Sequence, residues 1–361
     1  MAPEFNPAGG ARESDVVGEF TAAAVAELHA RVAASLDRWS LSPATSIVLL
    51  NVSENATFAL SDPGGRELVL RLHRVGYSSL EEIRSEIAWM QALRRDGVIE
   101  TAAPVPGADG EWVQTLHSRA ATASRTAALT STPAPRFAVA FERLPGTEPD
   151  ARDAALWFER LGELTARMHG HSRSWRPPAA FRRKRWDFDA MVGPQGFWGS
   201  WRDGIGLDPA GITVLAATLA LIRERLARFG ESSAVFGLVH ADLRLANLLV
   251  DGTHLRIIDF DDCGFSWFLY DFATSVSFIE HEPQVPDLLR AWCSGYRRAL
   301  PLSDAHAAEI STFVILRRIL LTAWLASHAE IPFARELGAG YTAGTVTLAQ
   351  AWTRGDFLNS I

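Results

Sequence analysis

Two short polar segments carry the residues best suited to chemistry. Asp242 and Asn247 lie five positions apart in the first segment, and Asp259 ends the apolar run Leu255–Ile258 in the second. Charged side chains directly beside apolar strands are costly to bury unless they are paired or coordinated. A carboxylate, an amide oxygen and a second carboxylate suit a hard cation such as Mg²⁺ together with a hydroxyl group. The set therefore favours phosphoryl transfer, in which positioning and neutralising phosphate charge are most of the chemistry.

A predicted hairpin must bring these segments together. The apolar runs Leu248–Val250 and Leu255–Ile258 flank the turn Asp251–Gly252, and an Asp-Gly pair between two such runs is a strong hairpin signal. Around this hairpin, the chain from Ala154 onward has the three-to-four spacing of apolar residues that is typical of helices. We therefore expect a mainly helical region that holds one polar hairpin.

The N-terminal part has a different pattern. It reads as a small antiparallel sheet, and a break follows at Pro145–Gly146. The predicted strands are 46–51, 57–60, 67–73, 111–116 and 137–144, and the predicted helices are 14–39 and 79–95. The sequence thus predicts an N-terminal lobe (13–144), a helical C-terminal lobe (145–361), a disordered tail (1–12) and a flexible insertion (118–136).

The segments Val-His-Ala-Asp-Leu-Arg-Leu-Ala-Asn (239–247) and Ile-Asp-Phe-Asp-Asp-Cys-Gly-Phe (258–265) resemble a known family. They are similar to the aminoglycoside phosphotransferase and choline kinase-like branch of the protein-kinase-like fold, above all to its homoserine-kinase and hydroxylysine-kinase types. The resemblance implies an α+β, two-lobed fold with a small antiparallel-sheet N-lobe and a mainly helical C-lobe. It further implies Asp242 as catalytic base, Asn247 and Asp259 as metal ligands, ATP and Mg²⁺ as cofactors, and a small-molecule hydroxyl as acceptor.

The resemblance also implies a set of nucleotide-binding residues. Arg71 stands where the family has a phosphate-binding Lys, and Glu86 matches its ion-pair partner; Arg keeps the charge but is a wider fork. The loop that contains Ser53 and Asn55 has no glycine, unlike the corresponding loop of kinases. The segment 141–146 resembles the family's adenine-binding hinge, in which the backbone of Glu142 and Leu144 would bind adenine. Arg244 could contact the γ-phosphate or the acceptor, or form only a surface ion pair. The full set is Ser53, Asn55, Arg71, Glu86, Glu142, Leu144 and Arg244.

Several features have both a functional and a structural interpretation. Asp261 and Asp262 could orient metal or substrate, or form a solvated turn. The four cations at 182–185 are typical of a solvated loop. Four tryptophans could form an aromatic wall for a cationic, amino-bearing alcohol, or simply pack a loop-rich region; they are Trp175, Trp186, Trp198 and Trp201.

Composition sets the outer limits. The chain has 361 residues, with 35 Lys and Arg against 42 Asp and Glu, a net charge of −7, which argues against a nucleic-acid partner. Two widely spaced cysteines indicate a reducing, cytoplasmic setting, and the apolar stretch 212–222 is too short to span a membrane.

A protein Ser/Thr kinase and a non-catalytic nucleotide-binding regulator remain alternatives to a small-molecule kinase.

Overall fold

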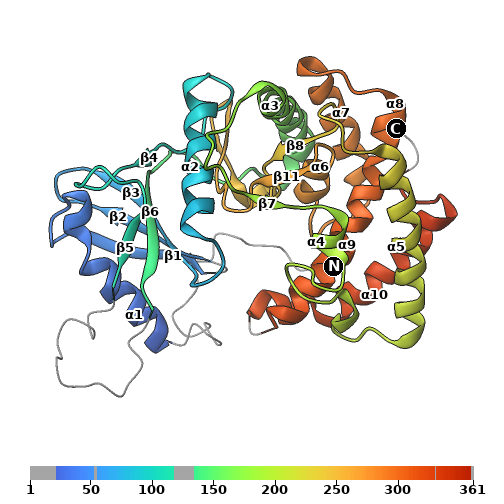
Figure 1. Cartoon of the computed structure of the whole chain (residues 1–361), viewed down its shortest axis with the longest axis horizontal. Coiled ribbons are helices and arrows are strands. Elements are labelled where there is room, and N and C mark those ends of the chain that lie inside the picture. The colour runs from blue at the N-terminus through green and yellow to red at the C-terminus, as the bar shows by residue number, and fades with distance from the viewer. Residues whose placement is uncertain (1–21, 53–54, 118–133, 330, 359–361) are drawn as a thin grey trace. The chain divides into compact units, whose positions relative to one another are not determined.

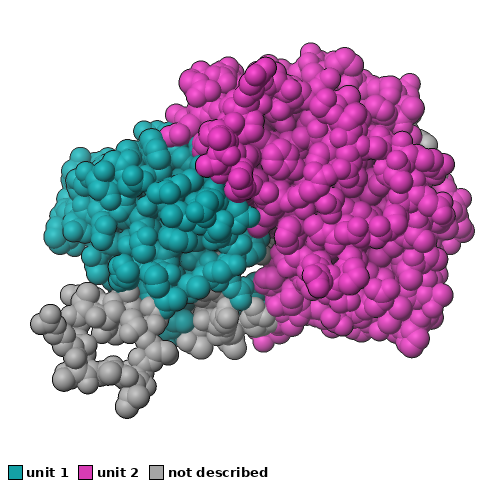
Figure 2. Space-filling model, viewed as in Figure 1, with its two compact units in different colours: residues 1–87, 102–143, 330–333 teal, residues 88–101, 144–329, 334–361 magenta. Residues whose placement is uncertain are grey.

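The computed structural model describes residues 22–52, 55–117, 134–329 and 331–358. The chain divides into two compact units, coloured separately in Figure 2. Unit 1 takes its described residues from 1–87, 102–143 and 330–333, and unit 2 takes them from 88–101, 144–329 and 334–361. The predicted tail (1–12) and residues 118–133 of the predicted insertion lie outside the described residues.

Unit 1 is built on one antiparallel sheet (Figure 1). Its strands are β1 (Ser46–Val52), β2 (Asn55–Ser61), β3 (Glu67–His73), β4 (Pro104–Val105), β5 (Gln114–Leu116) and β6 (Arg136–Glu142), in the spatial order β1-β2-β3-β6-β4 with β5 also paired to β6. Alternate residues of β3 enter the core, where Leu68, Leu70 and Leu72 are fully buried. This two-residue period is the one that the sequence shows.

The first helix differs from its prediction. The sequence predicts one helix over 14–39, of which residues 14–21 are not described; the structure has α1 (Ala22–Ala33) and then a separate 3-10 turn, η1 (Leu36–Trp39). The break falls at Ser35, whose N–H and hydroxyl both donate to the carbonyl of Val32, each at 2.9 Å. A serine that bonds to the preceding turn in this way competes with the helical hydrogen bond. The next helix, α2 (Leu80–Arg95), agrees with its prediction.

Unit 2 is mainly helical (Figure 1). Its helices are α3 (Ala154–Ser174), α4 (Phe188–Val192), α5 (Pro209–Phe229), α6 (Tyr270–Ser275), α7 (Val285–Ala299), α8 (Asp304–Ala308), α9 (Ile310–Ser327) and most of α10 (Pro332–Arg354), with the 3-10 turns η3 (Ala151–Asp153), η4 (Trp201–Asp203) and η5 (Leu245–Asn247). Asp304–Ser327 is long and apolar enough to cross a membrane, but 83% of its most apolar window is buried inside the protein. It therefore has the surroundings of a core helix.

Two small sheets hold the polar segments of unit 2. The predicted hairpin is present as β9 (Leu248–Asp251) and β10 (His254–Ile257), and Gly252 adopts the positive φ of +60° that its turn requires. A second sheet was not predicted: β11 (Gly264–Trp267) pairs antiparallel with β8 (Phe236–Val239) and parallel with β7 (Lys184–Arg185). Strands of two to four residues are too short to show an alternating pattern.

The close packing of α3 against α7 depends on two glycines. A Cβ on Gly295 would lie 1.8 Å from the carbonyl oxygen of Glu159, and one on Gly162 would lie 2.1 Å from the carbonyl oxygen of Trp292. Both obstacles are backbone atoms, which cannot turn aside as a side chain can. The two helices therefore touch backbone to backbone at these positions.

Gly295→Ala tests this packing. We expect the free energy of unfolding to fall by about 2 kcal/mol or more, because the new methyl group must push two helices apart. Gly170→Ala on α3 is the matched control, since its Cβ would meet Leu300 at an ordinary 3.7 Å and alanine is the better helix former by up to about 1 kcal/mol. Chemical denaturation of both variants gives the comparison, and an unchanged midpoint for Gly295→Ala would contradict it.

Candidate active site

The predicted catalytic carboxylate lies in the loop between β8 and η5 of unit 2. Asp242 is 13% exposed, and the Asn247 amide donates from Nδ2 to both the Asp242 backbone oxygen (2.8 Å) and its Oδ2 (2.7 Å). With its nitrogen committed to Asp242, the Asn247 side chain has its Oδ1 oxygen to offer a ligand. The structure thus brings Asp242 and Asn247 into direct contact.

His240 and Asn247 tie this loop to the strand end that precedes Asp259. The His240 Nε2 atom lies 3.0 Å from the carbonyl oxygen of Ile258, and the Ile258 N–H donates to the Asn247 carbonyl at 2.9 Å. Because the Asp242 N–H donates to His240 Nδ1 at 3.2 Å, His240 must carry its proton on Nε2 and donate to Ile258. Ile258 is therefore held at both its polar backbone atoms, directly before Asp259.

The backbone on both sides of the site is strained. Ala241 has φ +67° and Asp259 has φ +64°, a left-handed conformation that costs energy for residues with a Cβ and that is concentrated at functional sites. After Asp259, the ring of Phe260 packs edge-on against Trp89 at 5.6 Å and lies 4.5 Å from the His240 ring. The motif residue Phe260 is thus a packing residue that fixes the direction of the chain at Asp259.

A buried carboxylate on α6 holds the strained loop in place. Asp271 accepts hydrogen bonds from the backbone N–H of Ala241 at 2.7 Å and of His240 at 3.1 Å, and its Oδ2 lies 3.0 Å from His169 Nε2. The other His169 ring nitrogen lies 3.0 Å from the Tyr296 hydroxyl on α7. Asp271 therefore anchors the loop that carries Asp242.

Two arginines contact the carboxylate of Asp242. Arg244, predicted as a ligand-binding residue, donates from Nε to Oδ1 at 3.2 Å and to Oδ2 at 3.3 Å. Arg317 on α9 donates from Nη2 to Oδ1 at 3.2 Å and was not found from the sequence. It lies 75 positions from Asp242 inside an apolar helix, and a charged residue in such a helix is the signal that could have pointed to it.

The surroundings of Arg317 favour its charged form. Burial works against the charge, but Tyr270 and Asp242 raise the pKa of Arg317 above its usual value. Burial also raises the pKa of the Tyr270 phenol, which Arg317 only partly offsets. Tyr270 is therefore neutral, and its hydroxyl oxygen can accept the hydrogen bond from Arg317 Nη1 at 3.1 Å.

The basic run at 182–185 is only in part the solvated loop that its composition predicts, because Arg182 and Arg185 are exposed but the two residues between them are buried. Arg183 and Lys184 are each only 9% exposed. Arg183 donates to the carbonyl oxygens of Asp261 and Cys263, and Lys184 Nζ forms an ion pair with Asp262 at 2.9 Å. The two cations thus fix the turn that follows Asp259, and Asp262 belongs to that buried pair rather than to a solvated turn.

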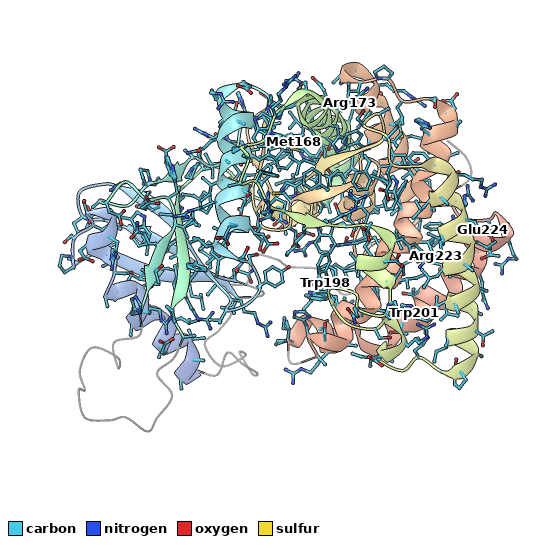
Figure 3. All side chains as sticks on the ribbon, viewed as in Figure 1. Met168, Arg173, Trp198, Trp201, Arg223 and Glu224 are labelled. Carbon is cyan, nitrogen blue, oxygen red and sulfur yellow. The ribbon has the colours of Figure 1, made fainter. Side chains whose placement is uncertain are left out.

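The four tryptophans divide by their surroundings. Trp186 is buried and donates from Nε1 to the Asp262 carbonyl, and Trp201 is 2% exposed. Trp175 stacks on His171 with a centroid distance of 5.8 Å. Figure 3 labels Trp198 and Trp201, which come from the segment between α4 and α5. Only Trp198 reaches the site, where its ring lies 5.2 Å from the Arg317 guanidinium carbon.

Unit 1 holds most of the predicted nucleotide-binding residues. Arg71 on β3 and Glu86 on α2 form a buried ion pair with 2.6 Å between Nη1 and Oε1, and the guanidinium carbon of Arg71 lies 5.1 Å from the Phe141 ring centroid. Asn55 Oδ1 accepts the Arg74 N–H at 3.2 Å. Ser53 lies outside the described residues.

The predicted hinge backbone has one group already engaged. The Glu142 N–H donates to the Ala103 carbonyl at 2.8 Å, so an adenine contact from Glu142 would use its carbonyl oxygen. Leu144 is the first residue of the segment 144–329 of unit 2 and is half-buried. Four residues further on, burial raises the pKa of the Glu148 carboxyl, and Arg244 partly opposes that shift.

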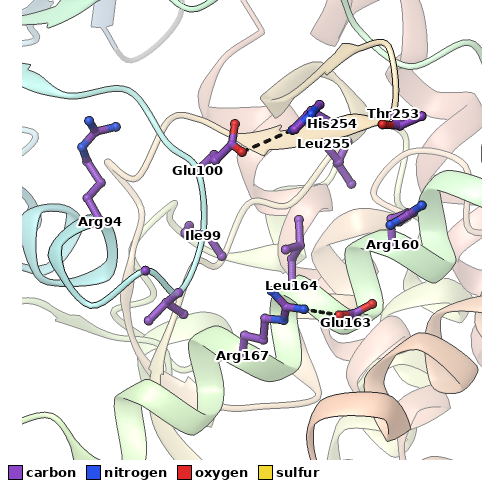
Figure 4. A pocket seen from close by; sticks show the side chains of 12 residues that line it. Arg94, Ile99, Glu100, Arg160, Glu163, Leu164, Arg167, Thr253, His254 and Leu255 are labelled. Carbon is purple, nitrogen blue, oxygen red and sulfur yellow. Dashed lines mark hydrogen bonds and ion pairs between the residues drawn. The ribbon is translucent and has the colours of Figure 1, made fainter.

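A cavity of about 470 Å³ lies elsewhere in unit 2 (Figure 4). Its lining comes from the end of α2, the following loop, α3 and the hairpin turn, and includes none of the predicted site residues. Charged pairs line it: Glu163 is bound to Arg167 one turn further along α3, and Glu100 lies 3.3 Å from His254. This cavity is therefore not the centre formed around Asp242.

The metal-binding capacity of the described residues is modest. In those parts of the chain, no cluster of three or more His, Cys, Asp and Glu side chains is arranged to hold a metal ion. Asn247 and Asp259 offer an amide oxygen and a carboxylate, which are ligands suited to a hard divalent cation that also binds phosphate oxygens. This donor set fits Mg²⁺ bound together with a nucleotide rather than a metal caged by protein alone.

Comparison with known proteins identifies the family. The profile of the phosphotransferase enzyme family (APH) matches residues 47–302. The chain belongs to this family. A solved structure of a microcompartment-associated aminopropanol kinase is 37% identical, with a TM-score of 0.81 over 91% of this chain and 99% of that one. The predicted family, the α+β protein-kinase-like fold and the phosphotransferase class are confirmed.

Other relatives of this phosphotransferase are more distant. Amicoumacin kinase of Bacillus subtilis (strain 168) is 26% identical over 265 residues, which cover 70% of this chain and 72% of that protein. The structure of amicoumacin kinase hAmiN in complex with AMP-PNP, Ca²⁺ and Ami has a TM-score of 0.71 at 21% identity, over 93% of this chain and 98% of that one. The latter supports the fold alone.

Asp271→Asn tests the anchor of the loop that carries Asp242. The amide keeps one acceptor oxygen but places an NH₂ group where a second acceptor is needed, so one buried donor loses its partner. We expect the free energy of unfolding to fall by about 3 kcal/mol, together with a loss of phosphotransfer. Asp287→Asn is the control, because its ion pair with Arg290 is exposed and such pairs contribute little. Equal stability of the two variants would refute the anchoring role.

Proposed function

We propose that this protein is a kinase that transfers the γ-phosphate of ATP, with Mg²⁺, to the hydroxyl of a small amino alcohol in the cytoplasm. The observation that carries the proposal is the contact of Asp242 with Asn247, which is joined through Ile258 to Asp259. The 37% identity to an aminopropanol kinase supports the acceptor class. Both cysteines are buried free thiols, in keeping with a reducing compartment.

Each residue has a definite task in this reaction. Asp242 accepts the proton of the acceptor hydroxyl as that oxygen forms its bond to the γ-phosphorus, and ADP leaves with the bridging oxygen. Asn247 and Asp259 would hold the metal, which when bound neutralises phosphate charge. Arg244 is half-exposed beside Asp242 and can turn its planar fork to a phosphate oxygen.

Unit 1 would supply most of the nucleotide contacts. The Arg71–Glu86 pair keeps a cation fixed on β3, where it can bind phosphate oxygens as the lysine of related kinases does. The Glu142 carbonyl and the Leu144 backbone would bind adenine, and Ser53 and Asn55 would line the phosphates. These are assignments by position in the family motif, and the buried ion pair is their best structural support.

A peptide acceptor fits less well. Four residues separate Asp259 from β11, and α6 begins three residues after that strand ends. A protein Ser/Thr kinase needs a longer segment here to bind its peptide. A non-catalytic regulator is opposed by the intact set of Asp242, Asn247 and Asp259. ATP turnover over amino alcohols, hydroxy amino acids, antibiotics and peptides, with the product verified by phosphorus NMR, separates these functions; turnover on peptides alone would overturn the proposal.

Asp242→Asn removes the proposed base while keeping its shape. We expect kcat to fall by about 10²–10⁴-fold, with the KM for ATP little changed, because the residue acts on the acceptor proton. The control is again the exposed Asp287→Asn variant. An unchanged kcat at saturating ATP and acceptor would show that Asp242 is not the base.

Asp259→Asn tests metal binding. Asparagine tolerates the left-handed backbone at this position, φ +64°, so the substitution removes charge with little added strain. We expect the Mg²⁺ concentration for half-maximal activity to rise more than about 10-fold, with the melting temperature retained. A wild-type Mg²⁺ dependence in the folded variant would contradict the assignment.

A further inference from the structure

Arg317 is a buried cation that donates a hydrogen bond from each of its three guanidinium nitrogens. Its side chain is 3% exposed. Nη2 donates to Asp242 Oδ1 at 3.2 Å, Nη1 to the Tyr270 hydroxyl at 3.1 Å, and Nε to the Ser277 hydroxyl at 3.3 Å. Burying a guanidinium is costly unless its donors are satisfied, so three separate elements are committed to this one side chain.

Aromatic rings restrict the guanidinium further. The Trp198 ring centroid lies 5.2 Å from its central carbon, and the Tyr270 ring centroid lies 5.8 Å from it. A planar guanidinium stacks on such rings, and its fork has a fixed geometry. With rings and hydrogen-bond acceptors on several sides, Arg317 has little freedom to turn.

The carboxylate of Asp242 is consequently held by two buried groups, in addition to the half-exposed Arg244 that contacts both its oxygens. Arg317 on α9 binds Oδ1, and Asn247 in η5 binds Oδ2 at 2.7 Å. We propose that Arg317 is a positioning residue that fixes the plane of the Asp242 carboxylate, so that the lone pairs left by Arg244 when it turns to a phosphate oxygen face the acceptor hydroxyl. The inference rests on the proposed role of Asp242 as base. Trp198, in the segment between α4 and α5, contributes to this positioning through its contact with Arg317.

The neighbouring arginine supplies a matched control. Arg318 is also buried on α9, but its ion pair is with Glu280, whose other oxygen accepts the Tyr341 hydroxyl at 2.9 Å. Successive helical residues point about 100° apart, which explains why adjacent arginines serve different partners. Arg318→Lys and Arg317→Lys disturb buried ion pairs of the same helix, yet only Arg317 contacts Asp242.

The test is a double-mutant cycle. We expect Arg317→Lys to lower kcat by about 10–100-fold, with the KM for ATP changed less than about 2-fold, because lysine keeps the charge but loses the fork. In an Asp242→Asn background the same substitution should change kcat by less than about 2-fold, since a residue that acts through another has no effect once the other is gone. Arg318→Lys should leave kcat within about 2-fold in both backgrounds.

Each outcome decides the inference. Equal losses from Arg317→Lys in both backgrounds would show a structural role only, and no loss in the wild-type background would show no role. Full activity of Asp242→Asn alone would instead overturn the base in the proposed function and this inference with it. If Arg317→Lys does not fold, Tyr270→Phe removes the hydroxyl that orients Nη1. We expect Tyr270→Phe to lower kcat several-fold in the wild-type background and to leave kcat unchanged in the Asp242→Asn background. Persistence of the loss in the second background would refute the inference.

Discussion

The loop that carries Asp242 depends on one fully buried carboxylate. Asp271 accepts the backbone N–H groups of His240 and Ala241 and contacts His169, so its charge is met entirely by polar groups of the protein interior. These bonds stabilise a left-handed backbone at Ala241 that the loop would otherwise avoid. Because Asp242 follows directly, the point at which its side chain leaves the backbone depends on an interaction in which Asp242 takes no part, before Arg317 and Asn247 bind its carboxylate.

The side chains that contact Asp242 differ in their exposure to solvent. Arg317 and Asn247 are buried and hold the carboxylate, whereas Arg244 is half-exposed and able to move. Arg183 and Lys184 fix the turn after Asp259. Buried ionic groups of this kind seldom add much net stability. In the proposed function, their value lies in holding Asp242 and Asp259 in place before a substrate arrives.

The sequence predicted what local pattern encodes. The hairpin, the sheet of unit 1, the long helices and the pairing of Arg71 with Glu86 follow from spacing and motif. Arg317 and the anchoring role of Asp271 could not be predicted, because their partners lie 75 and about 30 positions away and no periodicity reports such contacts. The prediction for the basic run 182–185 was wrong for Arg183 and Lys184 for a related reason. Composition favours solvent exposure of four successive cations, and only the fold shows that backbone carbonyls and Asp262 bind these two.

The backbone contact between α3 and α7 has a consequence for how this chain can vary over evolution. His169 on α3 and Tyr296 on α7 meet at 3.0 Å, and Gly162 and Gly295 set the distance at which those helices run. Homologues that keep the His169–Tyr296 contact should therefore keep both glycines, while exposed positions on the same helices drift. Exchange at either glycine would be tolerated only with a compensating shift of the whole helix.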